Sequence, residues 1–180
     1  MTALPNSAFK AVRWPFANLY ASPLWLGLRV YLGLVWLQFG LGKVRGGWLT
    51  GNPMKSMLTA IAEGNLPGAL PGYDRFAGLL LEIGADRAMS IGLPLFELAV
   101  AAAFFSGALV VPAAIAATLM NVNLILSGIA SWHFDGHIIA MQVLLLLAWR
   151  VAGYLGLARL RPLARRLRIA IQGGHTLHHV

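Results

Sequence analysis

The sequence predicts an all-α membrane protein, a four-helix transmembrane bundle with a long extracytoplasmic loop between its first and second spans. Three observations predict this class: 58% of the 180 residues are hydrophobic, only 11% are charged, and the mean hydropathy is +0.71. A soluble domain carries roughly 25% charged residues. This chain therefore lacks the polar surface of a soluble protein, and its length suits one compact domain.

The excess of positive charge is concentrated at the two ends of the chain. The formal net charge is +8. Basic residues crowd the C-terminal tail and the N-terminal segment, and neither contains Asp or Glu. Basic segments that flank apolar spans favour the cytoplasmic side of a membrane. We therefore expect a multi-pass protein of the cell (inner) membrane with both termini cytoplasmic, and no nucleic-acid partner.

The first half of the chain predicts one span followed by a long loop. Residues 1–22 form a cytoplasmic or interfacial lead-in without the apolar core of a signal peptide. A first span over 23–42 has the roughly 20 residues that cross a bilayer. In the loop that follows, Met54–Glu63 and Asp74–Gly84 have the apolar spacing of short amphipathic helices. We expect both to lie on the membrane surface.

The second half of the chain predicts three further spans. Between Met89 and Ala130 the only charged residue is Glu97, and this stretch is too long for one span. A turn at Ser106-Gly107 divides it into spans over 88–105 and 109–130. A loop over 131–136 then precedes a fourth span over 137–157. Together, residues 23–157 form the membrane domain, and 158–180 form a basic cytoplasmic tail.

Three charged residues fall inside the predicted spans: Arg29, Glu97 and Arg150. A charge at mid-membrane costs roughly 2.5–3.5 kcal/mol. A rise of about 1.5 Å per residue places Glu97 at the middle of its span and both arginines within roughly 6 Å of theirs. Asn121 lies near the centre of the third span. We therefore predict that the arginines neutralise Glu97 inside the bundle.

The face of the first span that carries Arg29 is expected to be the packed face. At 100° per residue its small, aromatic and basic side chains fall within about 80° of one another. These residues are Arg29, Gly33, Trp36, Gly40 and Lys43. Two interpretations of the charged cluster remain open. It fixes which helices pack together, or it binds a polar headgroup such as a quinone or an acidic ligand.

Four segments resemble the DoxX family of integral membrane proteins. The segment LRVYLGLVWLQFGLGKVRGGWL (28–49) is similar to the family's first helix, and PLFELAVAAA (94–103) to its glutamate-bearing second helix. MNVNLILSGIAS (120–131) is similar to its Asn-rich third helix, and Arg150, Gly153 and Tyr154 to its Gly-Arg-Tyr ending. The resemblance spans about residues 24–157, with gaps in the long loop. Where the family often continues with Asn-Pro, this chain has Trp132-His133-Phe134-Asp135.

The resemblance is nearest to the DoxD branch, the membrane subunit of thiosulfate:quinone oxidoreductase. It implies a four-helix membrane bundle and an oxidoreductase that reduces quinone with electrons from thiosulfate. We therefore predict a quinone-interacting membrane redox protein without a covalently bound cofactor. Its partners are the lipid bilayer, the quinone and a soluble or membrane partner subunit. The alternatives are a non-catalytic membrane anchor or assembly subunit and, ranked lower, a small transporter.

The candidate site residues follow from the charged cluster and the aromatic residues beside it. The predicted catalytic residues are Arg29, Glu97 and Arg150. The predicted quinone site comprises Arg29, Trp36, Glu97, Asn121, Trp149, Arg150 and Tyr154. The residues expected to attract an incoming anion are Lys43, Arg45, His133 and His137.

No metal site is predicted. His133 and His137 have a metal-ligand spacing, but Gly136 intervenes in the predicted loop and no third ligand is evident. Proton handling near a quinone by His133, Asp135 or His137 remains open. The absence of cysteine excludes disulfides and thiolate chemistry.

Overall fold

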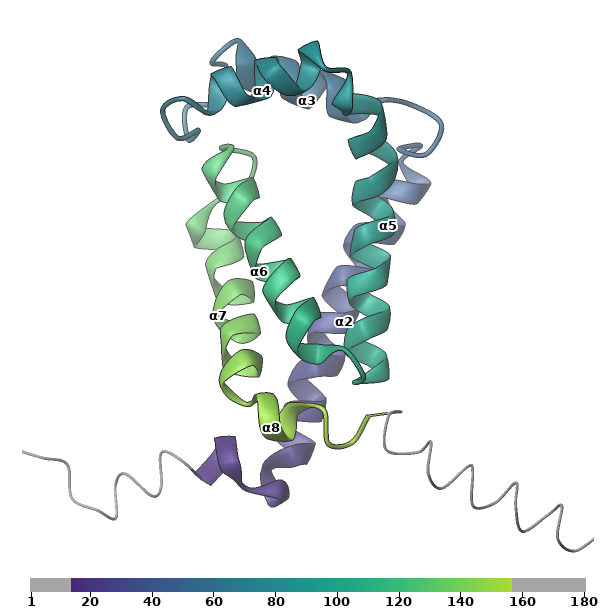
Figure 1. Ribbon diagram of the computed structural model, residues 1–180, viewed down its shortest axis with the longest axis vertical. Coiled ribbons are helices and arrows are strands. Elements are labelled where there is room, and N and C mark those ends of the chain that lie inside the picture. Colours follow the sequence, from purple (N-terminus) through teal and green to yellow (C-terminus); the bar gives the residue numbers. More distant parts are fainter. Residues whose placement is uncertain (1–13, 157–180) are drawn as a thin grey trace, which may run out of the picture.

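The computed structural model describes residues 14–156, apart from the side chain of Phe134. Every element in this range is a helix and none is a strand, which confirms the all-helical prediction (Figure 1). The basic tail and residues 1–13 of the lead-in lie outside the described residues. The elements are η1 (Leu19–Ala21), α2 (Ser22–Arg45), α3 (Pro53–Ala62), α4 (Tyr73–Glu82), α5 (Ala85–Ser106), α6 (Val110–Leu126), α7 (Trp132–Leu147) and α8 (Trp149–Ala152).

Among the residues that the structure describes, two stretches of helix are long and apolar enough to cross a membrane: Leu19–Arg45, which contains α2, and α5. α6 and most of α7 are apolar but shorter. These four helices run along the long axis of the molecule, while α3 and α4 lie across its upper end (Figure 1). Both ends of the described chain lie at the lower end, beside α8.

The most extensive helix packing joins α2 and α5, which run antiparallel. Two glycines of α2 permit it: a Cβ on Gly33 would lie 2.9 Å from the Phe105 ring, and one on Gly40 would lie 2.8 Å from Leu98. Small residues at such positions let helix backbones approach closely. Arg29, Gly33, Trp36 and Gly40 are all buried, which confirms the predicted packed face of the first span.

α3 and α4 are held to the upper end by an apolar cluster and by polar contacts. Met54, Leu58 and Ile61 of α3 are buried against Ala77 of α4. The Ser90 hydroxyl of α5 donates to Asn52 and accepts from the Met54 N–H, at 2.8 and 3.1 Å. On the other side, the Tyr73 hydroxyl donates to the Asn123 side chain at 2.5 Å. The α3–α4 pair thus bridges α5 and α6.

The last helix differs from the predicted fourth span. Residues 132–136, expected in a loop, form the first turn of α7, and the Asp135 carboxylate accepts from the Ser131 N–H at 3.2 Å. An acidic side chain in the first turn stabilises a helix start. The helix then ends at Leu147, and α8 begins after Ala148. Within the described residues, the predicted span of about 137–157 is therefore not one unbroken helix but α7 followed by the short α8.

Candidate functional site

A buried ion pair joins α2 to α5. The Lys43 ammonium donates to Glu97 Oε1 at 2.6 Å. The Glu97 side chain is 1% exposed and that of Lys43 23%. This is the only salt bridge among residues 14–156. Such short charge-assisted bonds are among the stronger hydrogen bonds in proteins, so Lys43 supplies the charge that neutralises Glu97.

Aromatic rings surround the lysine. Its ammonium lies 5.8 Å from the centroid of the Phe39 ring and 5.5 Å from that of Trp48. Trp36, one turn back along α2, packs edge-on against Phe39 and against Phe96 of α5, with centroids 6.1 and 6.4 Å apart. Cations are attracted to ring faces at such distances. The lysine is therefore held by a carboxylate and by two rings.

The ion pair borders a cavity of about 210 Å³ between α2, α5, α6 and the first turn of α7. Trp36, Asn121 and Asp135 also line it. Within the described part of the chain, five fully buried side-chain polar atoms have no hydrogen-bond partner. Three of them, Glu97 Oε2, Asn121 Nδ2 and Trp36 Nε1, belong to residues that line this cavity, whereas Arg29 Nε and Gln142 Nε2 lie outside it. A buried polar atom without a partner costs about 1–3 kcal/mol, so the cavity offers unused donors and an unused acceptor.

Arg29 lies at the opposite end of α2 and does not reach Glu97. It is fourteen residues before Lys43, or about 21 Å along the helix. Its guanidinium donates to the carbonyl oxygens of Ala152 and Leu155, at 3.1 and 3.4 Å. It thereby ties the end of α8 to α2. The predicted pairing of Arg29 with Glu97 is wrong, and the contacts of Arg29 are those of a packing residue.

Arg150 is also remote from Glu97. It is exposed, and its guanidinium lies 5.0 Å from the centroid of the neighbouring Trp149 ring, which is itself 59% exposed. Tyr154 is half-buried two residues beyond α8, next to the Leu155 carbonyl that Arg29 binds. The predicted cluster of two arginines around one glutamate is therefore not formed. The physical reason is the register of α2 against α5, which places Glu97 level with the upper end of α2.

The residues expected to attract an anion separate into two groups. Lys43 lies in the site itself, whereas Arg45, His133 and His137 are exposed. The two histidines share α7, so Gly136 does not interrupt their helix. Within residues 14–156 no three His, Cys, Asp or Glu side chains are placed to hold a metal ion. Sequence analysis missed Lys43 as the partner of Glu97, although Lys43 was on the predicted packed face.

This arrangement suits a small neutral headgroup that both donates and accepts hydrogen bonds. Asn121 Nδ2 and Trp36 Nε1 are free to donate, and Glu97 Oε2 is free to accept. An anion would meet the Glu97 carboxylate, so the site disfavours one. Cavities with apolar walls and a few placed polar groups are typical of small-molecule sites.

The fold and the site define a class: a helical protein with two helices of membrane-spanning length and a buried ion pair beside a small polar cavity. Comparison of the chain with protein-family models, with curated proteins and with solved structures finds no match. The resemblance to the DoxX family therefore remains a prediction.

Proposed function

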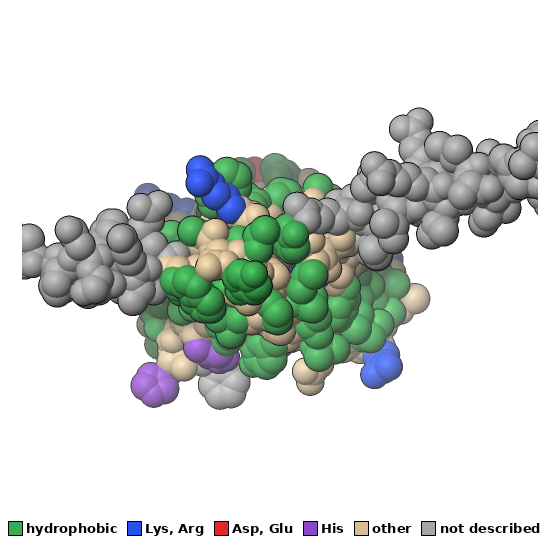
Figure 2. All heavy atoms as spheres, turned by 90° about the horizontal axis from the view of Figure 1, so that it is seen from below, with side chains coloured by type: hydrophobic (Ala, Val, Ile, Leu, Met, Phe, Trp, Pro, Cys, Tyr) green, Lys and Arg blue, Asp and Glu red, His purple; other side chains and the backbone are tan. Residues whose placement is uncertain are grey.

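We propose that this chain is a quinone-binding membrane protein, embedded through α2, α5, α6 and α7. Each of these helices has a leucine side chain that is more than half exposed, which is unfavourable in water. Leu34, Leu95, Leu119 and Leu147 are 54%, 51%, 65% and 60% exposed. Figure 2 looks at the molecule from below, at the α8 end, where hydrophobic side chains are visible between tan and basic ones. The leucines of the four helices therefore carry the argument for lipid contact. Lipid is the environment in which such a surface has no hydrophobic cost.

The proposed orientation places both chain termini in the cytoplasm. The described chain starts and stops at the same end of the bundle, the end where α8 lies (Figure 1). In the sequence, one basic tail precedes the described chain and the other comes after it, so both adjoin residues at this end. Arg150 is on α8 at this end too. The positive-inside rule then assigns the α8 end to the cytoplasm and α3–α4 to the outer face.

The main observation in favour of this proposal is that three helices each place a polar atom without a hydrogen-bond partner in one cavity beside the ion pair. These atoms are Trp36 Nε1, Glu97 Oε2 and Asn121 Nδ2. A quinone ring is neutral, flat and has two carbonyl oxygens, which accept hydrogen bonds. Asn121 and Trp36 supply donors for them, and Lys43 stabilises negative charge that develops on an oxygen. Glu97 is placed to accept a hydrogen bond from the hydroxyl of the reduced form.

A bound quinone would supply redox chemistry, because it takes up two electrons and two protons to become a quinol. In the proposed reaction the electrons come from thiosulfate, as the DoxD resemblance implies, through a partner subunit. The role of this chain is to bind the ring and to deliver protons. Glu97, a carboxylate in its pair with Lys43, would take up a proton and pass it to the reduced ring, and Asp135 lines the same cavity closer to the outer end of α7. These two carboxyl groups form the proposed proton route.

Calorimetric titration of the purified protein with a quinone that lacks a long tail tests this proposal. Lys43→Met should weaken binding of the quinone, and Glu97→Gln binding of its reduced quinol, each by about tenfold or more, because a hydrogen bond to a charged group contributes about 1.5–3 kcal/mol. Arg45→Met is the matched control, since it removes an exposed charge two residues away on the same helix. Its affinity should equal that of the wild type.

Unchanged affinity in both site variants, with the helical circular dichroism of the wild type, would refute the proposal. If either variant fails to fold, Asn121→Leu provides the same test without disturbing the ion pair. Loss of binding in Arg45→Met as well would show that only net charge matters, and would equally count against a defined site.

A second candidate is a membrane subunit that assembles with a partner. The observation in its favour is the exposed apolar face of α4 and its C-cap, where Phe76, Leu79 and the C-cap residue Ile83 are 47%, 52% and 66% exposed. Phe76→Ser with Leu79→Ser should then abolish co-purification of a stoichiometric partner while quinone binding stays intact. A complex of unchanged composition would rule this candidate out.

A further inference from the structure

A second, apolar groove adjoins the proposed headgroup cavity. It has a volume of about 480 Å³ and lies mainly along α5, where Ala88, Gly92 and Phe96 line it at intervals of four residues. Residues four apart lie on one face of a helix. Small side chains at the first two positions leave the groove open: a Cβ added to Gly92 would meet no atom within 4 Å.

The groove and the polar cavity share a wall. Met120 of α6 lines both. Phe96, in the groove, contacts Trp36, in the cavity, with ring centroids 6.4 Å apart. A molecule with a polar ring and an apolar chain can therefore place its ring beside Lys43 and Glu97 and its chain along α5.

We propose that this groove holds the isoprenoid tail of the quinone, so that the ligand is a long-chain prenylated quinone rather than a small soluble one. This inference rests on the proposed function and narrows its ligand class. The groove has more than twice the volume of the headgroup cavity, about 480 against 210 Å³. A tail that lies there packs against side chains of α5 and against Met120, and each further isoprene unit in the groove adds such contacts.

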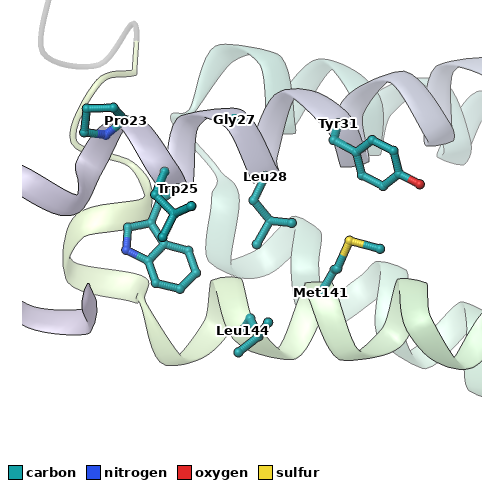
Figure 3. A pocket seen from close by; sticks show the side chains of 8 residues that line it. Pro23, Trp25, Gly27, Leu28, Tyr31, Met141 and Leu144 are labelled. Atoms are coloured by element: carbon teal, nitrogen blue, oxygen red, sulfur yellow. The ribbon is translucent and has the colours of Figure 1, made fainter. Parts of the chain in front are cut away.

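A larger apolar groove elsewhere provides the comparison. It lies between α2 and α7, has a volume of about 750 Å³, and is lined by residues that include Gly27, Tyr31 and Met141 (Figure 3). No residue lines both this groove and the polar cavity. The indole N–H of Trp25 in its wall already donates to the Pro15 carbonyl at 2.6 Å. We therefore assign the tail to the α5 groove.

The test compares the variants Gly92→Leu and Gly27→Leu. Both glycines lie in helices, and a Cβ added at either position meets no atom within 4 Å, so the two substitutions start from matched surroundings. Binding is titrated with quinones that share one headgroup and carry no, one, two or three isoprene units. Because each quinone partitions into detergent equally in all samples, the comparison between proteins at each tail length isolates the groove.

For the wild type, affinity should rise with tail length. Gly92→Leu should bind the tail-less quinone as the wild type does and the three-unit quinone at least about tenfold more weakly, a difference of about 1.4 kcal/mol. Gly27→Leu should match the wild type throughout. Equal behaviour of the two variants, or affinity independent of tail length, would overturn the tail assignment and leave the headgroup site standing. If no quinone of any length bound to the wild type, the proposed function would fall and the tail assignment with it.

Discussion

Removing Lys43 alone, which leaves the Glu97 carboxylate unpaired, should destabilise the protein more than removing both charges together. Removing one partner of a buried pair costs about 3–5 kcal/mol, because the other charge is left without compensation. The Glu97 side chain is 1% exposed, so Lys43→Met should cost about 3 kcal/mol; the partial exposure of the lysine puts the value at the low end. In Glu97→Gln, the Lys43 ammonium still contacts solvent and two aromatic rings. This change should therefore lower the unfolding free energy by about 1–2 kcal/mol.

The double variant leaves no buried charge unpaired. Its loss of stability should therefore be about 1–2 kcal/mol, less than that of Lys43→Met alone. A coupling energy of about 3 kcal/mol follows, at the upper end of values for contacting residues. The assay is reversible denaturant unfolding in detergent micelles at one pH, with Arg45→Met as the control, which should lie within about 0.5 kcal/mol of the wild type. If the stability losses of the two single variants summed to that of the double variant within about 0.5 kcal/mol, Lys43 and Glu97 would not be coupled as a buried ion pair.

Three further predictions concern the parts of the fold that surround the site. Gly107 has a φ of 66°, and a Cβ on it would lie 2.8 Å from Gly156 and against the Arg29 guanidinium. Gly107→Ala should therefore lower the unfolding free energy by more than about 2 kcal/mol. An unchanged midpoint of denaturant unfolding would contradict this. Ser90→Ala removes a buried hydroxyl that donates one hydrogen bond and accepts another. It should lower the unfolding free energy by about 1–3 kcal/mol and raise the rate of hydrogen exchange in α3. An exchange rate equal to that of the wild type would argue that Ser90 does not hold α3 to α5. Burial raises the pKa of the Tyr73 phenol, whereas its hydrogen bond to Asn123 lowers it less. Its contribution to stability is therefore full below about pH 10 and declines as the pH rises above it, and Tyr73→Phe should abolish that decline in a pH series of unfolding curves.

The sequence predicted which face of the first helix packs and which polar residues of α2, α5 and α6 share a site. Of the seven residues expected at the quinone site, Trp36, Glu97 and Asn121 line one cavity, whereas Arg29, Trp149, Arg150 and Tyr154 do not. That this cavity binds a quinone stays a prediction. The packed face of the first helix was predictable because helical periodicity and the cost of a buried charge both act locally. A glutamate in an apolar helix needs a partner wherever that helix packs.

The partner of Glu97 could not be deduced in the same way. Depths were counted from the centres of the predicted spans, which assumes that the spans align. The contacts of Gly33 with Phe105 and of Gly40 with Leu98 set a different register. That register is decided by which small residues meet which large ones, and hydropathy does not encode it. It moves Glu97 toward Lys43 and leaves Arg29 about 21 Å away.

The start of α7 was missed for a related reason. The segment SWHFDG has turn residues and no apolar periodicity, so it predicted a loop. In the structure, Asp135 accepts from the Ser131 N–H and the helix begins at Trp132. One side-chain contact thus extends the helix, and it also brings Asp135 to the cavity wall.

We expect the cavity beside Lys43 and Glu97 to hold the ring of a prenylated quinone. The most direct measurement is organic extraction of the protein purified from its native membrane in mild detergent, with mass spectrometry of the extract. We expect close to one prenylated quinone per chain in the wild type and in Arg45→Met, and a loss of most of it in Asn121→Leu. An extract without quinone, or the same quinone content in all three proteins, would contradict the claim.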